Sequence, residues 1–153
     1  MSAALPPYAY VPGQTPRHPE DRFAEITDTV SPGMDTDQLT RTRAWLAGQS
    51  YYRAGYYWEA HEVLEPVWMQ TAPGTAQRHV VQALIQLANA RLKARMGKPR
   101  AVLRLCDIAT EHLDQVTVAP GQTVMGLDLA YLRSEIEDIR RAIAEARSGD
   151  APA

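Results

Sequence analysis

Residues 51–69, YYRAGYYWEAHEVLEPVWM, combine a histidine, three glutamates and a dense set of aromatic side chains in one segment. The apolar residues recur at the 3.6-residue spacing of an α-helix that begins near Gly55 and Tyr56. On a helical wheel, Tyr57, Leu64 and Trp68 fall on one side. The segment therefore predicts a helix that packs against a helical core, and the rest of the chain must supply that core.

The same helix carries a charged pair in an apolar setting. His61 and Glu65 lie four residues apart, next to Trp68 on the wheel, and Trp58 lies just beyond Glu65. A fully solvated ion pair is not expected between two tryptophans, because buried charges need partners. The pattern predicts a polar cluster that faces another part of the fold.

The run His61-Glu62-x-x-Glu65 is similar to the H-E-x-x-H motif of zinc peptidases, with Glu65 in place of the second histidine. Side chains at i and i+4 converge, so His61 and Glu65 could share a divalent metal ion. A third ligand would have to come from elsewhere, and its candidates are His18, His79, His112 and the glutamates. Glu59 points away from this cluster and is given no role.

The whole chain predicts an all-α fold: a single compact bundle of five to six antiparallel helices with short loops and tetratricopeptide-like hairpins at Gly55 and Gly97. Residues 1–20 contain five prolines interleaved with Tyr8 and Tyr10, which predicts an extended arm that can lie along a groove of the body. The helical domain is expected at 21–147 and a frayed tail at 148–153. The expected helices span about 20–30, 36–53, 56–70, 75–96, 99–116 and 127–147.

The helix expected at 75–96 is apolar over more than half of its circumference, so it should be central to the bundle. Its polar stripe includes Gln82 and Gln86, whose amides both donate and accept hydrogen bonds. We expect these glutamines to face His61 and Glu65 across an interhelical seam. An accessible seam would be a binding site, whereas a sealed one would only fix the packing.

Two further expectations concern single side chains. Arg91 falls inside the apolar arc of the central helix, so it either extends its charged end to solvent or is the counterion of a glutamate. The helix expected at 36–53 should begin with a capping box of Asp35 and Gln38. Its expected core contacts are Leu39, Trp45, Leu46 and Tyr52.

Composition narrows the function classes. The chain is 45% hydrophobic and 22% charged with a formal net charge of −2, so no nucleic-acid partner is expected. The single cysteine, Cys106, excludes an internal disulfide and a multi-cysteine zinc site. Neither a signal peptide nor an apolar run of the ~20 residues that span a bilayer is apparent, so a cytoplasmic protein without membrane association is expected. Monomer and homodimer both stay open.

The chain resembles the domain-of-unknown-function 309 family over residues of about 45–113. The resemblance rests on AGYYWEAHEVLEPVW at 54–68, VQALIQLANA at 81–90, and a glycine turn at 97–101. The chain departs from the family pattern at Ala83, where glycine is common, which should alter only how closely the helices approach. The resemblance implies a compact all-helical bacterial or archaeal domain and implies no activity.

Three functions follow as hypotheses. The first is a binding module for a small ligand, a metal ion or a peptide. The second is a metal-dependent hydrolase-type enzyme with Glu62 or Glu65 as general base and His61 as ligand or acid. The third is a protein-interaction scaffold in which the polar cluster only fixes packing. The expected binding cluster consists of Trp58, His61, Glu62, Glu65, Trp68, Gln82 and Gln86.

Overall fold

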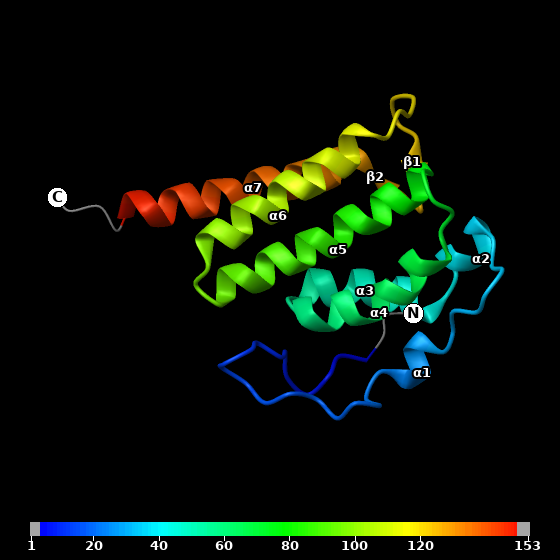
Figure 1. Cartoon of the computed structure of the whole chain (residues 1–153), viewed down its shortest axis with the longest axis horizontal. Helices are drawn as coiled ribbons and strands as arrows, with labels where there is room; N and C mark the ends of the chain where they lie inside the picture. The colour runs from blue at the N-terminus through cyan, green and yellow to red at the C-terminus, as the bar shows by residue number, and fades with distance from the viewer. Residues whose placement is uncertain (1–3, 150–153) are drawn as a thin grey trace.

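Three consecutive helices, joined by short turns, form the centre of the molecule (Figure 1). They are α3 (Arg43–Ala54), α4 (Tyr57–Gln70) and α5 (Ala76–Arg95). On the other side of α5 lie α6 (Pro99–Asp114) and α7 (Leu129–Gly149), so α5 is in the middle of the bundle. The computed structural model describes residues 4–149, and the predicted all-α bundle is confirmed.

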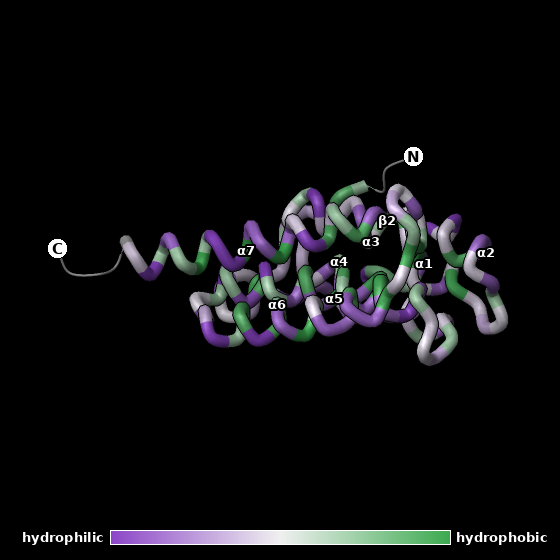
Figure 2. The backbone as a smooth tube through the Cα atoms, turned by 90° about the horizontal axis from the view of Figure 1, so that it is seen from above, coloured by the Kyte–Doolittle hydropathy of each residue, from purple (hydrophilic) through white to green (hydrophobic). Residues whose placement is uncertain are grey.

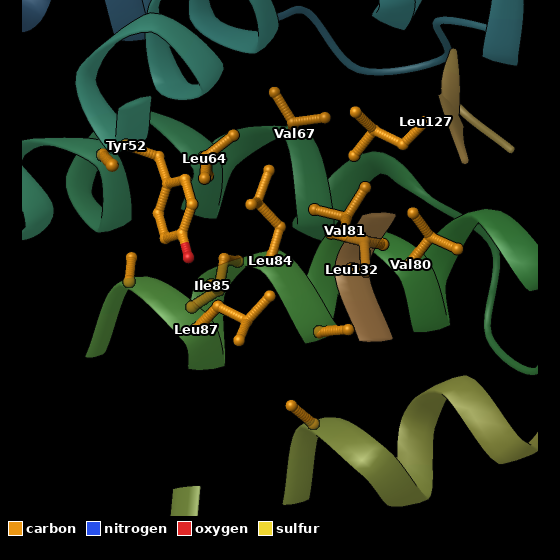
Figure 3. Packing of buried hydrophobic residues seen from close by; sticks show 14 of the residues in the cluster. Tyr52, Leu64, Val67, Val80, Val81, Leu84, Ile85, Leu87, Leu127 and Leu132 are labelled. Atoms are coloured by element: carbon orange, nitrogen blue, oxygen red, sulfur yellow. The ribbon is translucent and has the colours of Figure 1, made fainter. Parts of the chain in front are cut away.

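The central position of α5 follows from its composition. Nine of its residues are buried, and its valines and leucines meet side chains of α3, α4 and α7 (Figure 3). Leu64 and Val67 approach from α4, Tyr52 from α3 and Leu132 from α7. Such burial stabilises the fold by about 25 cal/mol per Å² of apolar surface removed from water.

Two glycines fix the α3–α4 hairpin. Gly55 ends α3 with a φ of 87°, a left-handed conformation that glycine adopts without strain. Its carbonyl accepts a hydrogen bond from the guanidinium of Arg95 at the end of α5. Gly48 lies in the middle of α3, and a Cβ atom there would overlap the buried side chain of Leu64. The absence of a side chain at Gly48 therefore lets α3 and α4 approach closely.

The expectation of one helix over 36–53 is wrong, because the helix is interrupted at Thr42. α2 ends two residues earlier (Thr36–Thr40), and Thr42 has an extended backbone with φ −69° and ψ 150°. Its hydroxyl donates to Leu39 O at 2.8 Å and accepts from the Trp45 N–H at 3.2 Å, which caps α3.

The capping box at the start of α2 is confirmed, since Asp35 and Gln38 each accept a hydrogen bond from the other's backbone N–H. The expectation that Leu46 is a core contact is wrong, because its side chain is 44% exposed. Leu39, Trp45 and Tyr52 are buried as expected.

The segment before α7 is a short hairpin that the helical pattern did not predict. β1 (Thr123–Val124) pairs antiparallel with β2 (Leu127–Asp128) through a turn at Met125 and Gly126, both of which have positive φ. Val124, Met125 and Leu127 are buried, and the Met125 carbonyl accepts from the Trp45 indole N–H at 3.1 Å. The hairpin therefore closes one end of the core.

The chain ends differ in how they meet the bundle. α1 (Ala24–Thr27) is shorter than the helix expected at 20–30. α7 runs to Gly149 and extends beyond the bundle, with polar and apolar turns alternating along it (Figures 1 and 2).

The expected arm and tail include residues 1–3 and 150–153, which lie outside the described residues. None of the described helices is long and apolar enough to cross a membrane.

Candidate functional site

The expected polar cluster begins with His61 and Glu65 on α4. His61 Nε2 lies 3.5 Å from Glu65 Oε2, and the two side chains are 31% and 51% exposed. Trp58 and Trp68 are both half-buried, so the tryptophans do not seal the pair from solvent. The pair is therefore a partly solvated contact, which contributes little to stability.

Gln82 and Gln86 lie half-buried on α5. Gln86 Oε1 lies at 3.5 Å from its donor, Asn89 Nδ2. Within residues 4–149, no hydrogen bond joins either glutamine to His61 or Glu65. The structure thus brings His61 and Glu65 together but does not join them to the glutamines, and the binding role of the seven residues stays a prediction.

A metal centre at His61 and Glu65 would need further ligands. Over the described part of the chain, no group of three or more histidine, cysteine, aspartate or glutamate side chains is arranged to hold a metal ion. Any ion at this pair would therefore take most of its coordination from solvent.

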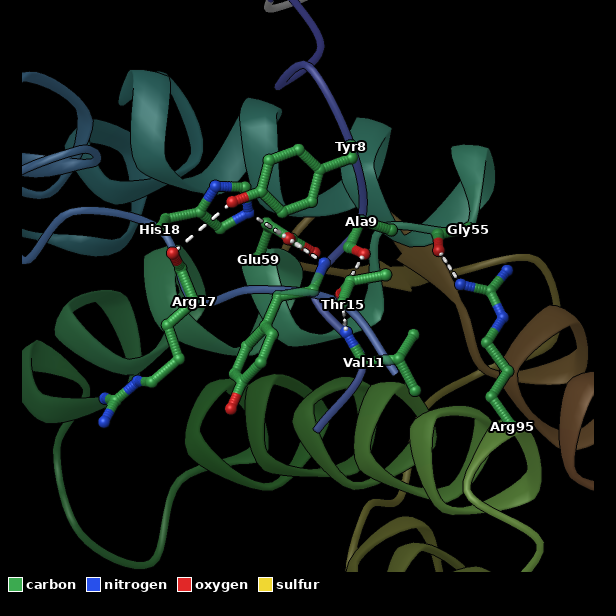
Figure 4. A network of polar contacts seen from close by, with 10 residues as sticks. Tyr8, Ala9, Val11, Thr15, Arg17, His18, Gly55, Glu59 and Arg95 are labelled. Atoms are coloured by element: carbon green, nitrogen blue, oxygen red, sulfur yellow. Dashed lines mark hydrogen bonds and ion pairs between the residues drawn. The ribbon is translucent and has the colours of Figure 1, made fainter. Parts of the chain in front are cut away.

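Glu59, to which the sequence assigned no role, is the fully buried charged side chain of α4. Its Oε2 accepts the backbone N–H of Tyr10 at 2.7 Å and lies 2.6 Å from His18 Nε2 (Figure 4). The side chain of His18 is only 2% exposed. Glu59 Oε1 has no hydrogen-bond partner in residues 4–149. A buried carboxylate with one unpartnered oxygen is energetically unfavourable. The two arm contacts to the other oxygen, Oε2, therefore stabilise the buried carboxylate.

The N-terminal arm supplies both partners of Glu59, and it is held by further contacts of its own. Tyr8 stacks on the His18 ring with a centroid distance of 4.7 Å (Figure 4). The Thr15 hydroxyl accepts from Val11 N at 2.8 Å and donates to Ala9 O at 3.0 Å, which closes a loop in the arm. Val11 is buried. The arm therefore docks on its own body, as the sequence allowed.

A pocket of about 540 Å³ opens between this arm, α1 and α4. His18 lies on its arm side, while Trp58 and Glu62 reach it from α4. Its lining residues are Arg17, His18, Pro19, Glu20, Phe23, Ala24, Thr27, Trp58 and Glu62. Two members of the expected binding cluster, Trp58 and Glu62, are thus in the pocket.

The pocket is lined by two aromatic rings, two carboxylates, one guanidinium and the imidazole of His18. Phe23 and Trp58 lie 6.1 Å apart between ring centroids, at an angle of 56°. Glu20 and Glu62 contribute one carboxylate each. Arg17, which is exposed, contributes a guanidinium. This set of groups can hold an apolar body with a positive charge at its edge.

Arg91 belongs to a separate polar network. Its guanidinium lies 3.0 Å from Glu135 Oε1 and donates to the Tyr52 hydroxyl at 2.8 Å. The Tyr52 hydroxyl in turn donates to Glu135 at 2.7 Å. Burial, and then Glu135, raises the pKa of Tyr52 well above its usual value. Of the two expectations for Arg91, the one that it is the counterion of a glutamate is correct. The network connects α3, α5 and α7.

Comparison with known proteins supports a family and no activity. No curated protein and no solved structure matches the chain. The family model described as "Domain of unknown function (DUF309)" matches residues 45–105. The match covers α4 and α5 completely, so Glu59, Trp58 and Glu62 lie inside it, and the arm with His18 lies outside it. Residues 45–105 are thus similar to the DUF309 family, as the resemblance predicts.

Proposed function

We propose that the protein is a small helical binding module that takes an organic cation in the pocket between the N-terminal arm and α4. The observation that supports this most is the composition of that pocket: two aromatic rings and two carboxylates around a space of about 540 Å³. Pockets of 300–1,000 Å³ are typical of small-molecule sites. The ligand class is an amine or ammonium compound with an apolar body.

The charge preference follows from the arrangement on α4. Trp58 and Glu62 are four residues apart, so their side chains lie on the same face of the helix. A cation over the Trp58 face gains about 0.5–2 kcal/mol from the ring quadrupole. A carboxylate beside it adds a charged hydrogen bond of about 1.5–3 kcal/mol. Glu20 on the arm gives the pocket a second carboxylate, against the single guanidinium of Arg17.

The contact between His18 and Glu59 serves this function by holding the arm in place. His18 lines the pocket, and the contact of its Nε2 with the buried Glu59 carboxylate holds the ring in position. Phe23 packs edge-on against the same ring, at 5.3 Å between centroids and an angle of 90°. The pocket wall is therefore preorganised, which reduces the entropy that binding must overcome.

The proposal keeps Trp58 and Glu62 of the expected cluster and moves the site away from its other members. The hydrolase hypothesis depended on a metal at His61 and Glu65, for which the described residues offer no third protein ligand. The scaffold hypothesis requires no small ligand at all. It becomes the alternative outcome of the ligand test.

The experiment is a calorimetric titration with three compounds of one shape: phenethylammonium, the corresponding alcohol, and the corresponding carboxylate. We expect the ammonium compound to bind and the other two to bind at least roughly tenfold more weakly. Trp58→Leu should remove most of the affinity, while Trp68→Leu, which changes a tryptophan outside the pocket, should not. Equal affinity for all three compounds would contradict the preference for a cation, and binding of none would contradict the proposal and favour the scaffold hypothesis.

A further inference from the structure

Two histidines meet between α5 and α6, away from the pocket. His79 lies near the start of α5 and His112 near the end of α6. Their Nδ1 atoms are 3.0 Å apart, and the ring centroids are 5.2 Å apart at an angle of 43°. Both residues are half-buried, so solvent reaches the pair.

This contact restricts the protonation of both rings. A hydrogen bond between two Nδ1 atoms requires that one ring donates a proton and the other presents a bare nitrogen. Two protonated rings would repel each other at this distance. The two Nδ1 atoms therefore share one proton, and without it their lone pairs would face each other. Such neutral imidazole nitrogens are also the commonest protein ligands of transition metals.

The two nitrogens are close enough together to become ligands of one metal ion. Imidazole nitrogens bind at about 2.0–2.1 Å from a first-row metal ion. Two ligands at a right angle would then be about 2.9 Å apart, and two ligands at a tetrahedral angle about 3.4 Å apart. The observed 3.0 Å is close to the first value. The centroid distance of 5.2 Å shows that the two nitrogens point at each other in the metal-free protein, so both rings have to turn before they share an ion. Right-angled nitrogen ligands are typical of tetragonal Cu²⁺ and Ni²⁺.

We propose that His79 and His112 form a two-histidine site for a divalent transition metal ion, with Cu²⁺ and Ni²⁺ bound more tightly than Zn²⁺. The Nδ1 atoms occupy two adjacent positions, and water completes the coordination, because the described residues offer no third protein ligand. The exposed carboxylate of Glu111, next to His112, adds negative charge near the ion. Neither histidine lines the pocket, so the site is independent of the proposed cation site.

The test uses full-length protein without an affinity tag, stripped with a chelator and titrated with Cu²⁺, Ni²⁺ and Zn²⁺. We expect one ion per chain and an electron paramagnetic resonance spectrum of bound Cu²⁺ with hyperfine splitting from two equivalent nitrogens. His79→Ala and His112→Ala should each weaken binding by more than roughly 100-fold, since even partners behind the ligands are worth about 10–100-fold. His112→Gln provides a second variant if the alanine protein does not fold.

The matched control is His61→Ala, which removes a histidine that is also partly exposed and four residues from a glutamate. It should leave the affinity and the nitrogen splitting unchanged. Loss of the ion in His61→Ala would place it at His61 and Glu65 and overturn the proposal. Unchanged binding in both the His79 and His112 variants, or a spectrum with a single nitrogen, would overturn it as well.

Discussion

The Glu59 carboxylate, completely buried in α4, lies 2.6 Å from Nε2 of His18 on the N-terminal arm. The two residues are 41 positions apart, and only Glu59 lies in the region that matches the DUF309 family. The contact therefore joins the region that is similar to this family to a segment outside it. The pocket that we propose as a ligand site depends on this junction, because the arm forms one of its walls.

The first prediction concerns the stability of that junction. His18→Ala leaves the Glu59 carboxylate buried without its imidazole partner, and removing the partner of a buried charge typically costs about 3–5 kcal/mol. We expect a loss of this size in the free energy of unfolding, measured by urea denaturation. Glu65→Ala, which breaks a half-exposed contact, should cost less than about 1 kcal/mol.

A double variant checks the physical reason. If the loss in His18→Ala arises from the uncompensated charge, then Glu59→Gln added to it should restore part of the stability. Additive losses in His18→Ala/Glu59→Gln would show that the charge is not responsible. Amide hydrogen exchange gives a second reading, since the Tyr10 N–H should lose its protection when the arm detaches.

The second prediction concerns the close approach of α3 and α4. Replacing glycine by alanine inside a helix normally stabilises it by up to about 1 kcal/mol. At Gly48 the added methyl group would overlap the buried Leu64 side chain, and overpacking costs about 1–3 kcal/mol. Gly48→Ala should therefore lower the melting temperature. Leu64→Ala in the same chain should make the Gly48→Ala change less harmful, and an unchanged or raised melting temperature in Gly48→Ala alone would be incompatible with the packing described.

The third prediction concerns pH and the metal-free protein. Burial, and then the neighbouring His79, lowers the pKa of His112, while Glu111 acts in the opposite direction. Because the folded pKa is below the unfolded value of 6.5, the unfolded chain takes up a proton first as the pH falls. The contribution of neutral His112 is fully present above pH 6.5 and is lost as the pH falls through the lower, folded pKa.

The measurement compares the free energy of unfolding at pH 7.5 and pH 5.5 in the presence of a chelator. The wild-type protein should lose more stability between these values than His112→Gln, in which this titration is absent. Equal losses in the two proteins would show that the His112 pKa is not lowered by folding.

Local signals in the sequence account for most of the fold. The ends of α4, α5, α6 and α7 were predicted to within about two residues, because glycines, prolines and apolar spacing mark them. The break at Thr42 was missed because the apolar pattern continues on both sides of it, and only the side-chain cap reveals it. The hairpin before α7 was missed because its strands have two residues each, which is too short for an alternating pattern.

The site was harder to predict, and Glu59 shows why. On the α4 wheel its position is close to that of Val63, which is fully buried, and this was a usable signal for burial. Its partner His18 follows four of the five prolines in residues 1–20, where no periodicity relates it to α4. Burial of the pair depends on docking of the arm, a long-range event that a single sequence does not encode in its spacing. Trp58 and Glu62, which line the pocket, were in the expected cluster because they lie in the conspicuous run on α4.

The most direct test of the proposed function is the ratio of affinities for phenethylammonium and its neutral alcohol in Glu62→Gln and Glu65→Gln. Both changes remove one carboxylate from α4, but only Glu62 lines the pocket. We predict that Glu62→Gln reduces the ratio by roughly tenfold to a hundredfold and that Glu65→Gln leaves it unchanged. An unchanged ratio in Glu62→Gln, or an equal fall in both variants, would contradict the assignment of this pocket as a cation site.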